Sequence, residues 1–200
     1  MLRPPLPYVE VHAPSHWRDW LAEHHATSSG VWAVTRKRFA VPPGHPYVSP
    51  RDLNEGCLCF GWIDSKPGRI DAERTALLCT PRKRGSGWSK VNKDRLEPLI
   101  AAGLVAPAGL AAIEAARADG SWGRLDLVDA LAEPEDLLVA LRGVPDAMVH
   151  WTAFPPSTRR GILEWISQAK RAPTRAARVA DTARMAGRDE RANAWPRPPS

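Results

Sequence analysis

The pattern of apolar and polar residues changes from strand-like runs in the first half of the chain to helical periods in the second half. Runs rich in β-branched and aromatic residues at 31–35, 60–65 and 75–80 predict strands. The proline-rich start predicts a further extended strand at 7–11, because proline blocks helix formation. The turn residues at 66–69 lie between two of these runs, so the pattern predicts a β-hairpin.

Helices are predicted wherever apolar residues recur at intervals of three and four. Ser15 is the expected N-cap of a helix that ends before Ser28. Ser49, followed by Pro50 and Asp52, has the pattern of an N-cap, a first-turn proline and an acidic first turn. After Asn92 the chain is helical in character, with helices expected before Gly103, from Pro107 to Asp119, from Pro134 to Gly143, around Ile162 to Ala169, and from Thr174 to about Ala186.

These elements predict an α+β fold in which a small antiparallel sheet from the N-terminal half packs against a mainly helical C-terminal half. The chain has 200 residues, of which 44% are hydrophobic, and this is enough for one real core. We therefore expect a single domain over residues 1–187. Residues 188–200 lack periodicity and are expected to form a flexible tail.

The composition of the chain indicates its cellular compartment and whether it needs a metal or cofactor. No run of about 18 apolar residues is present and the N-terminus lacks a signal-peptide pattern, so we expect a cytoplasmic protein without a membrane span. Cys57, Cys59 and Cys79 are an odd number in apolar surroundings, which favours buried, reduced thiols over a disulfide framework. Their spacing lacks a second paired motif for zinc, and we expect neither a metal nor a cofactor.

The charge pattern raises the chance of an anionic partner. The net charge is +6 with a pI near 9.6, and the basic residues gather in two clusters, residues 82–95 and 170–191. Nucleic-acid binding through both clusters is one alternative, with tryptophans stacking on bases. It ranks last, because 22 acidic residues offset the basic ones.

Trp62 and Asp64 are the first candidate for chemistry. Side chains two apart on a strand share a face, so the carboxyl group would lie against an aromatic wall. Such an environment raises a carboxyl pKa and suits general acid or base catalysis. The alternative is that Trp62 is a core residue and Asp64 a turn cap, and we favour this alternative because aspartate is common at strand ends.

The segment from Arg82 to Asn92 is the second candidate. Arg82 offers a fork for a carboxylate or phosphate, and Trp88 offers a face for stacking beside the polar groups of Ser89 and Asn92. A solvated loop in which Ser89 or Asn92 caps a helix is an equally open interpretation. The second basic cluster, Lys170, Arg171, Arg175 and Arg178, is most simply a solvated helical face, and its sharper interpretation is an anion clamp facing this loop.

Three sequence blocks carry a family resemblance. Residues 57–64, 80–83 and 87–92 read CLCFGWID, TPRK and GWSKVN, and in this order the chain resembles the YdeI/OmpD-associated family, also called bacteriocin-protection proteins. The similarity continues through PEDL at 134–137 and AKRAPTR at 169–175, so it extends over nearly the whole chain. The chain departs from the family pattern at Asn54-Glu55-Gly56 and at Gly123-Arg124-Leu125-Asp126.

The resemblance implies an α+β fold and a role in tolerance of bacteriocins and antimicrobial peptides, and it supplies no catalytic residue. Our first hypothesis is a protective protein that binds a small antibiotic or peptide in a Trp- and Arg-lined cleft. The second is an enzyme that modifies or hydrolyses a small natural product with Asp64 as acid or base. The candidate ligand-binding residues are Trp62, Arg82, Trp88, Ser89, Asn92, Lys170, Arg171 and Arg175.

Overall fold

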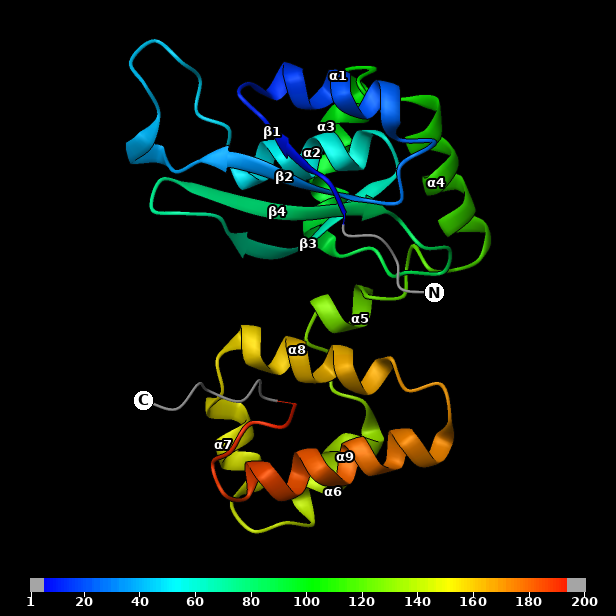
Figure 1. Cartoon of the computed structure of the whole chain (residues 1–200). Coiled ribbons are helices and arrows are strands. Elements are labelled where there is room, and N and C mark those ends of the chain that lie inside the picture. The colour runs from blue at the N-terminus through cyan, green and yellow to red at the C-terminus, as the bar shows by residue number, and fades with distance from the viewer. Residues whose placement is uncertain (1–5, 194–200) are drawn as a thin grey trace, which may run out of the picture. The chain divides into compact units, whose positions relative to one another are not determined.

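The computed structural model describes residues 6–193, which divide between Arg124 and Leu125 into an N-terminal and a C-terminal compact unit. The predicted α+β class is confirmed, because the first unit contains a four-stranded sheet and the second is helical (Figure 1). That residues 1–187 form one domain stays a prediction. It is tested by whether the chain unfolds in a single cooperative transition. Residues 1–5 of the proline-rich start and residues 194–200 of the predicted tail lie outside the described residues.

The sheet of the N-terminal unit has the strand order β1-β2-β4-β3. β2 (Val31–Arg36) pairs antiparallel with β4 (Arg74–Pro81), which pairs antiparallel with β3 (Trp62–Arg69). β1 (Tyr8–Glu10) runs parallel to β2, so the expectation of a purely antiparallel sheet is wrong at this pair. The physical reason is the helix α1 (Pro14–His24) between them, since a helical crossover returns the chain in the same direction.

The predicted hairpin is confirmed, but its turn lies later than the sequence suggested. Residues 66–69 belong to β3, and the chain turns between Arg69 and Arg74. The pairing register shifts between Asp64 and Pro67, which marks a bulge. Because β3 is an edge strand, Pro67 is tolerated there without a backbone donor.

Helix α2 (Pro50–Cys59) contacts β3 and β4 and is central to the N-terminal unit. Its predicted N-cap is confirmed as a full capping box. The Ser49 hydroxyl oxygen accepts from the Asp52 amide at 3.2 Å, and the Asp52 carboxylate accepts from the Ser49 amide at 2.7 Å. The cap fixes where α2 starts and hence which of its residues face the sheet.

Helix α1 packs closely on α2 (Figure 1). The prediction of Ser15 as its N-cap is wrong, because α1 already begins at Pro14, and the N-cap is Ala13, which offers no side-chain acceptor. The buried Trp17 donates its indole N–H to the Leu53 carbonyl at 3.0 Å. A Cβ atom at Gly56 would lie 2.5 Å from the Trp17 ring, so this departure from the family pattern is a packing requirement.

Helices α3 (Lys90–Ala101) and α4 (Pro107–Ala118) complete the N-terminal unit around α2. The Cys59 carbonyl at the end of α2 accepts from the Ala106 amide at 2.9 Å, and a Cβ at Gly109 would lie 2.3 Å from the same oxygen. The predicted burial of the free thiols is confirmed for all of Cys57, Cys59 and Cys79. The core includes Trp17, Leu21, Val31, Leu53, Leu58, Trp62, Trp88 and Leu96.

The C-terminal unit has its own core. Trp151 is fully buried and donates its indole N–H to the Glu133 carboxylate at 2.7 Å. Around it lie Leu137, Leu141, Ile162, Ile166, Val179 and Ala183. The helices are α5 (Asp126–Asp129), α6 (Glu135–Arg142), α7 (Ala147–Ala153), α8 (Pro156–Ser167) and α9 (Ala172–Ala186), and α9 contacts α6, α7 and α8.

Candidate ligand-binding site

Arg82 follows directly after β4 and carries the least satisfied polar group among the sequence-predicted site residues. Its Nη1 donates to the Gly87 carbonyl at 3.0 Å and to the Ser86 hydroxyl at 3.3 Å. Its Nε and Nη2 are buried and find no hydrogen-bond acceptor within residues 6–193. Burial lowers the pKa of Arg82 to about 10, against the opposing influence of the Asp64 carboxylate. Buried donors without an acceptor are rare in folded proteins, and at a site they indicate a missing partner such as water or a ligand.

The ring of Trp88 packs against the guanidinium of Arg82. The Arg82 Cζ lies 3.7 Å from the centre of the Trp88 ring, and only 1% of Trp88 is exposed. Trp122 packs against Trp88 at a ring separation of 5.1 Å, and Lys93 and Arg117 each lie 5.2 Å from Trp122. Trp88 therefore positions the guanidinium, and its own face is covered by Arg82.

A small cavity opens beside the guanidinium. Arg124 donates to the Gly85 carbonyl and so ties the 82–88 loop to the end of the N-terminal unit. The side chain and amide of Ser121 lower the pKa of Asp119, which thus stays ionised at the cavity edge. The volume of about 50 Å³ admits a few waters or a group of carboxylate size. The lining includes Arg82, Lys83, Arg84, Gly85, Ser86, Trp88, Ala112, Ala116, Asp119 and Ser121.

Asp64 and Asn92 are brought together by a residue that sequence reasoning missed, Asn54 on α2. The Asn54 amide donates to the Asp64 carboxylate at 2.5 Å and to the Asn92 carbonyl oxygen at 3.3 Å. Its own carbonyl oxygen accepts from Arg95 Nη1 at 2.6 Å. Only 2% of Asn54 is exposed, so these bonds join α2, β3 and α3 in a buried polar network.

The sequence contained a signal for this network. Asn54 stands on a helix face whose other members, Leu53, Cys57 and Leu58, are all buried. A carboxamide on an apolar helical face requires polar partners from elsewhere in the fold. Asn54, which belongs to the departure from the family pattern at 54–56, is thus accounted for by hydrogen bonds inside the N-terminal unit.

Trp62 belongs to the core of the N-terminal unit. It is 1% exposed and donates its indole N–H to the His25 carbonyl at 3.1 Å. Together with the bond from Asn54 to Asp64, this supports the structural interpretation of the pair. A catalytic role for Asp64 and a ligand contact by Trp62 stay predictions, and an Asp64→Asn variant assayed for turnover tests the first of them.

Ser89 is the N-cap of α3 and accepts from the Asn92 amide at 3.4 Å. The capping interpretation of Ser89 is therefore confirmed. The side chain of Asn92 is directed to Asn54, as described above, and so its polar groups also serve the fold. Contact of either residue with a ligand stays a prediction.

The second basic cluster lies in the C-terminal unit. Arg175 forms a double hydrogen bond with Asp136 at 2.7 and 2.9 Å, which raises the pKa of Arg175 and lowers that of Asp136. Arg178 donates to the Trp165 carbonyl and lies 4.9 Å from the centre of its ring. Lys170 and Arg171 are exposed before α9. Since this cluster and Arg82 belong to different units, a shared anion clamp stays a prediction.

Two further features of residues 6–193 concern metal binding and membrane crossing. Within this part of the chain, no group of three or more His, Cys, Asp or Glu residues is placed to hold a metal ion. None of the described helices has both the length and the apolar character that a membrane crossing requires.

Comparison with known protein families divides the chain in the same way as its fold. Residues 130–189 match the family described as Bacteriocin-protection, YdeI or OmpD-Associated, which confirms the resemblance for this segment. The N-terminal motifs between Cys57 and Asn92 lie instead within residues 9–112, which match a different family. No curated protein and no solved structure matches the chain. The match over residues 9–112 covers more than half of the chain, so the chain belongs to the family described as Domain of unknown function (DUF8412), and its residues 130–189 are similar to the family described as Bacteriocin-protection, YdeI or OmpD-Associated.

Proposed function

We propose that this protein protects its cell against a bacteriocin or another small antimicrobial compound by binding a carboxylate of that compound in the Arg82 cavity. The observation that carries the proposal is the pair of buried Arg82 donors, Nε and Nη2, without an acceptor among the described residues. The segment at residues 130–189 supports the protective setting, because it matches a family described by bacteriocin protection.

The chemistry of the cavity favours a carboxylate. The Nε and Nη2 donors of a guanidinium form a planar fork that matches two carboxylate oxygens, and in Arg82 both of these donors are buried and lack an acceptor among the described residues. Trp88 and the Gly87 carbonyl hold the fork in place before a ligand arrives, which reduces the ordering cost of binding. The exposed Lys83 and Arg84 also line the cavity, so that three cationic side chains there outweigh the negative charge of Asp119.

The cavity size defines how much of the ligand is enclosed. A volume of about 50 Å³ takes the anionic end of a molecule, and ligand pockets that enclose a whole drug-sized compound are larger, at roughly 300 Å³ or more. The proposal is thus narrower than a cleft that holds an entire antibiotic. The rest of the ligand would lie on the exposed surface of the 82–88 loop.

A panel of antimicrobial peptides, each prepared as the free acid and as the C-terminal amide, tests the proposal. Binding is followed by tryptophan fluorescence, since Trp88 lies under Arg82. We expect the free acids to bind. The Arg82→Met substitution should weaken their binding by about tenfold or more, which is the scale of a lost charge-assisted hydrogen bond. Arg69→Met, at an exposed position on β3, is the matched control and should bind normally. Equal binding of acids and amides, or no response across the panel, would contradict the proposal.

The two alternative functions, catalysis by Asp64 and nucleic-acid binding, make different demands on the protein. Catalysis by Asp64 requires the group in a concave site with a substrate within reach, whereas its carboxylate is bonded to Asn54. Nucleic-acid binding requires a steep loss of affinity with salt. We further propose that the protein acts in the cytoplasm, because a reducing compartment keeps its three buried thiols free.

A further inference from the structure

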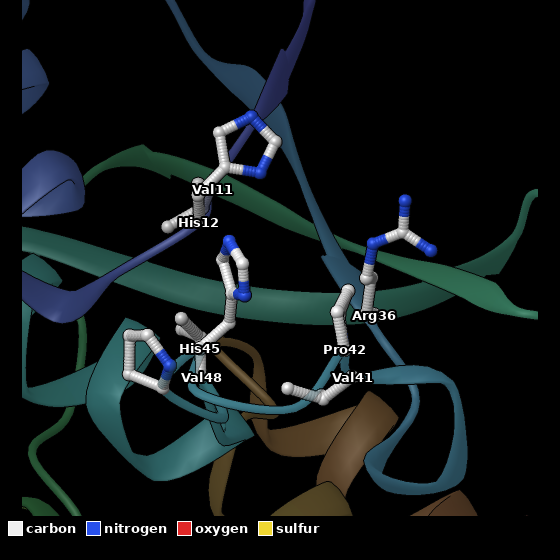
Figure 2. A pocket seen from close by; sticks show the side chains of 8 residues that line it. Val11, His12, Arg36, Val41, Pro42, His45 and Val48 are labelled. Carbon is white, nitrogen blue, oxygen red and sulfur yellow. The ribbon is translucent and has the colours of Figure 1, made fainter.

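A second and larger pocket lies in the N-terminal unit, at the sheet edge formed by β1. It is bounded on one side by the chain that leaves β1 and on the other by the proline-rich loop between η1 (Arg38–Ala40) and α2. Its volume of about 390 Å³ falls in the range of small-molecule sites. Figure 2 shows the side chains that line it, which are Val11, His12, Arg36, Val41, Pro42, His45, Pro46 and Val48.

The lining divides into an apolar wall and a polar rim. Val11 and Val48 are buried, and with Val41 and Pro42 they offer an apolar surface for the body of a ligand. The polar rim consists of His12, His45 and Arg36, each of which can donate hydrogen bonds, and the lining contains no carboxylate. Pockets of this composition favour a ligand with an apolar body and an acceptor-rich, anionic group.

The rim histidines keep ring nitrogens for a ligand. His45 Nδ1 lies 3.3 Å from the Pro43 carbonyl, and this contact uses one nitrogen of the ring. His12 stacks on His16 of α1 at a ring separation of 5.8 Å, which fixes its orientation. In Figure 2 the His12 ring lies above the His45 ring, and the Arg36 side chain lies to one side of both.

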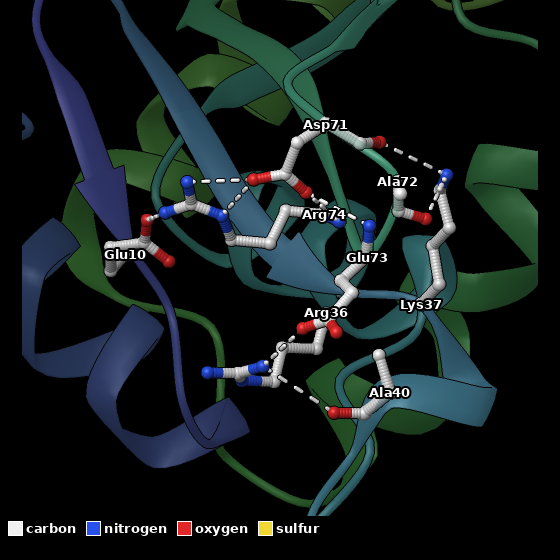
Figure 3. Close-up of polar contacts among 8 residues, drawn as sticks. All are labelled: Glu10, Arg36, Lys37, Ala40, Asp71, Ala72, Glu73 and Arg74. Atoms are coloured by element: carbon white, nitrogen blue, oxygen red, sulfur yellow. Dashed lines mark hydrogen bonds and ion pairs between the residues drawn. The ribbon is translucent and has the colours of Figure 1, made fainter.

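Arg36 is anchored at the end of β2 without being enclosed by its partners. Its Nη1 lies 3.3 Å from the Glu73 carboxylate and 3.5 Å from the Ala40 carbonyl (Figure 3). Both contacts use the same nitrogen, and 44% of the Arg36 side chain is exposed. The long contacts position the guanidinium and leave the rest of its fork available at the pocket rim.

Of the neighbouring carboxylates, that of Glu73 pairs with Arg36 itself, and those of Glu10 and Asp71 are held by Arg74. Arg74 donates to Glu10 at 2.5 Å and to Asp71 at 2.8 Å, and the pKa of Asp71 is lowered accordingly (Figure 3). The Lys37 ammonium donates to the Ala72 carbonyl at 2.7 Å and pins the hairpin turn. Because Arg74 takes up Glu10 and Asp71, these acids do not compete with a ligand for Arg36.

We propose that this pocket binds a small organic acid, with an aromatic or aliphatic body against Val11, Val41 and Val48 and a carboxylate at Arg36 and His45. It is a separate site from the Arg82 cavity, and neither depends on the other. The shared feature is only the class of anchor, since an arginine receives the carboxylate in both.

Titration of the full chain with benzoate, 4-phenylbutanoate and octanoate, followed by amide NMR, tests the proposal. Each acid is compared with its neutral amide. We expect saturable shifts of the amides of Val11, His12 and the non-proline residues of 41–48 for at least one acid, and about tenfold weaker binding of the neutral amide of that acid. Arg36→Gln and His45→Ala should weaken binding of the acid to a similar extent. Arg69→Gln, at an exposed arginine of β3, should leave it unchanged.

The same spectra show whether each variant remains folded, so loss of binding and loss of structure are distinguished. Arg82→Met is expected to leave these shifts intact, which separates this site from the proposed function. Acids and amides that bind equally, shifts confined to other parts of the chain, or no shift with any of the three acids at about 10 mM would overturn the proposal.

Discussion

Arg82 in the N-terminal unit and Arg175 in the C-terminal unit are the same residue type in opposite electrostatic surroundings. Arg175 is about one-third exposed and doubly bonded to Asp136, which raises its pKa. Arg82 is largely buried over Trp88, lacks an acceptor on two of its nitrogens among the described residues, and has its pKa lowered to about 10. Both positions belong to basic clusters that look alike in the sequence.

The difference separates a structural arginine from a binding one. The pair of Arg175 and Asp136 joins α9 to α6, and a half-exposed ion pair of this kind contributes little to stability, at about 0.5–1 kcal/mol. A buried guanidinium with unmet donors instead lowers the stability of the free protein. Such a group is understandable where a ligand supplies the missing acceptor, and this is the basis of the proposed function.

The largest expected effect on stability comes from replacing the tryptophans that contact an arginine of each basic cluster. Trp88→Ala removes a fully buried ring and should lower the free energy of unfolding by about 3–5 kcal/mol. Trp165→Ala is the matched change under Arg178, where the ring is only partly buried, and should cost roughly half as much or less. Urea unfolding followed by circular dichroism measures both. Equal decreases in the free energy of unfolding would contradict the contrast between the two regions.

Replacing each arginine by methionine should lower the free energy of unfolding at Arg175 but not at Arg82. Arg82→Met exchanges an incompletely bonded buried charge for an apolar chain, and should leave the free energy of unfolding unchanged or raise it by about 1–2 kcal/mol. Arg175→Met breaks the pair with Asp136 and should lower it by about 0.5–1 kcal/mol. A clear destabilisation by Arg82→Met in the same unfolding assay would show that Arg82 is structural.

The carboxylate of Asp136 should report the pairing through its titration. Its folded-state pKa is lowered below the ordinary 3.8, chiefly by hydrogen bonding to Arg175. The associated stability is therefore present at neutral pH and is lost as the pH falls through this lowered pKa. Carbon-detected NMR of the Asp136 carboxyl should give a midpoint below 3.8 that rises in Arg175→Met. The midpoint of Asp71, which Arg74 lowers, should stay unchanged as a control.

The smallest expected effect is on the exposed cations of the C-terminal cluster. Lys170→Ala and Arg171→Ala should change the free energy of unfolding by less than about 0.5 kcal/mol. If these residues form one clamp with Arg82, the same variants should weaken free-acid binding measurably despite their neutral effect on folding. Unchanged affinity would confine the site to the N-terminal unit.

Local features of the fold were readable from the sequence. Ser49 and Asp52 define the start of α2 within four residues, so the capping box could be predicted from their spacing. The parallel pairing of β1 with β2 could not, because it depends on how the chain returns after α1. Pro67 suggested a turn, yet an edge position in the sheet tolerates it within β3.

The candidate site was readable only in part. Arg82 and Trp88 lie six positions apart, so their proximity was within reach of local reasoning. The bond from Asn54 to Asp64 joins a helix to a strand, and the contact between Arg95 and Asn54 spans 41 positions. The sequence separates the members of this network, and only the packing of α3 on α2 brings them together.

The most direct measurement of the central claim is the NMR signal of the arginine side chains during titration with acetate, a carboxylate that fits the Arg82 cavity. The Arg82 Nε–Hε signal should shift and saturate with acetate and remain in place with acetamide, while the Arg175 signal, held by Asp136, stays constant. An Arg82 signal that does not respond to acetate, or that moves equally with both compounds, would contradict the assignment of Arg82 as a carboxylate-binding residue.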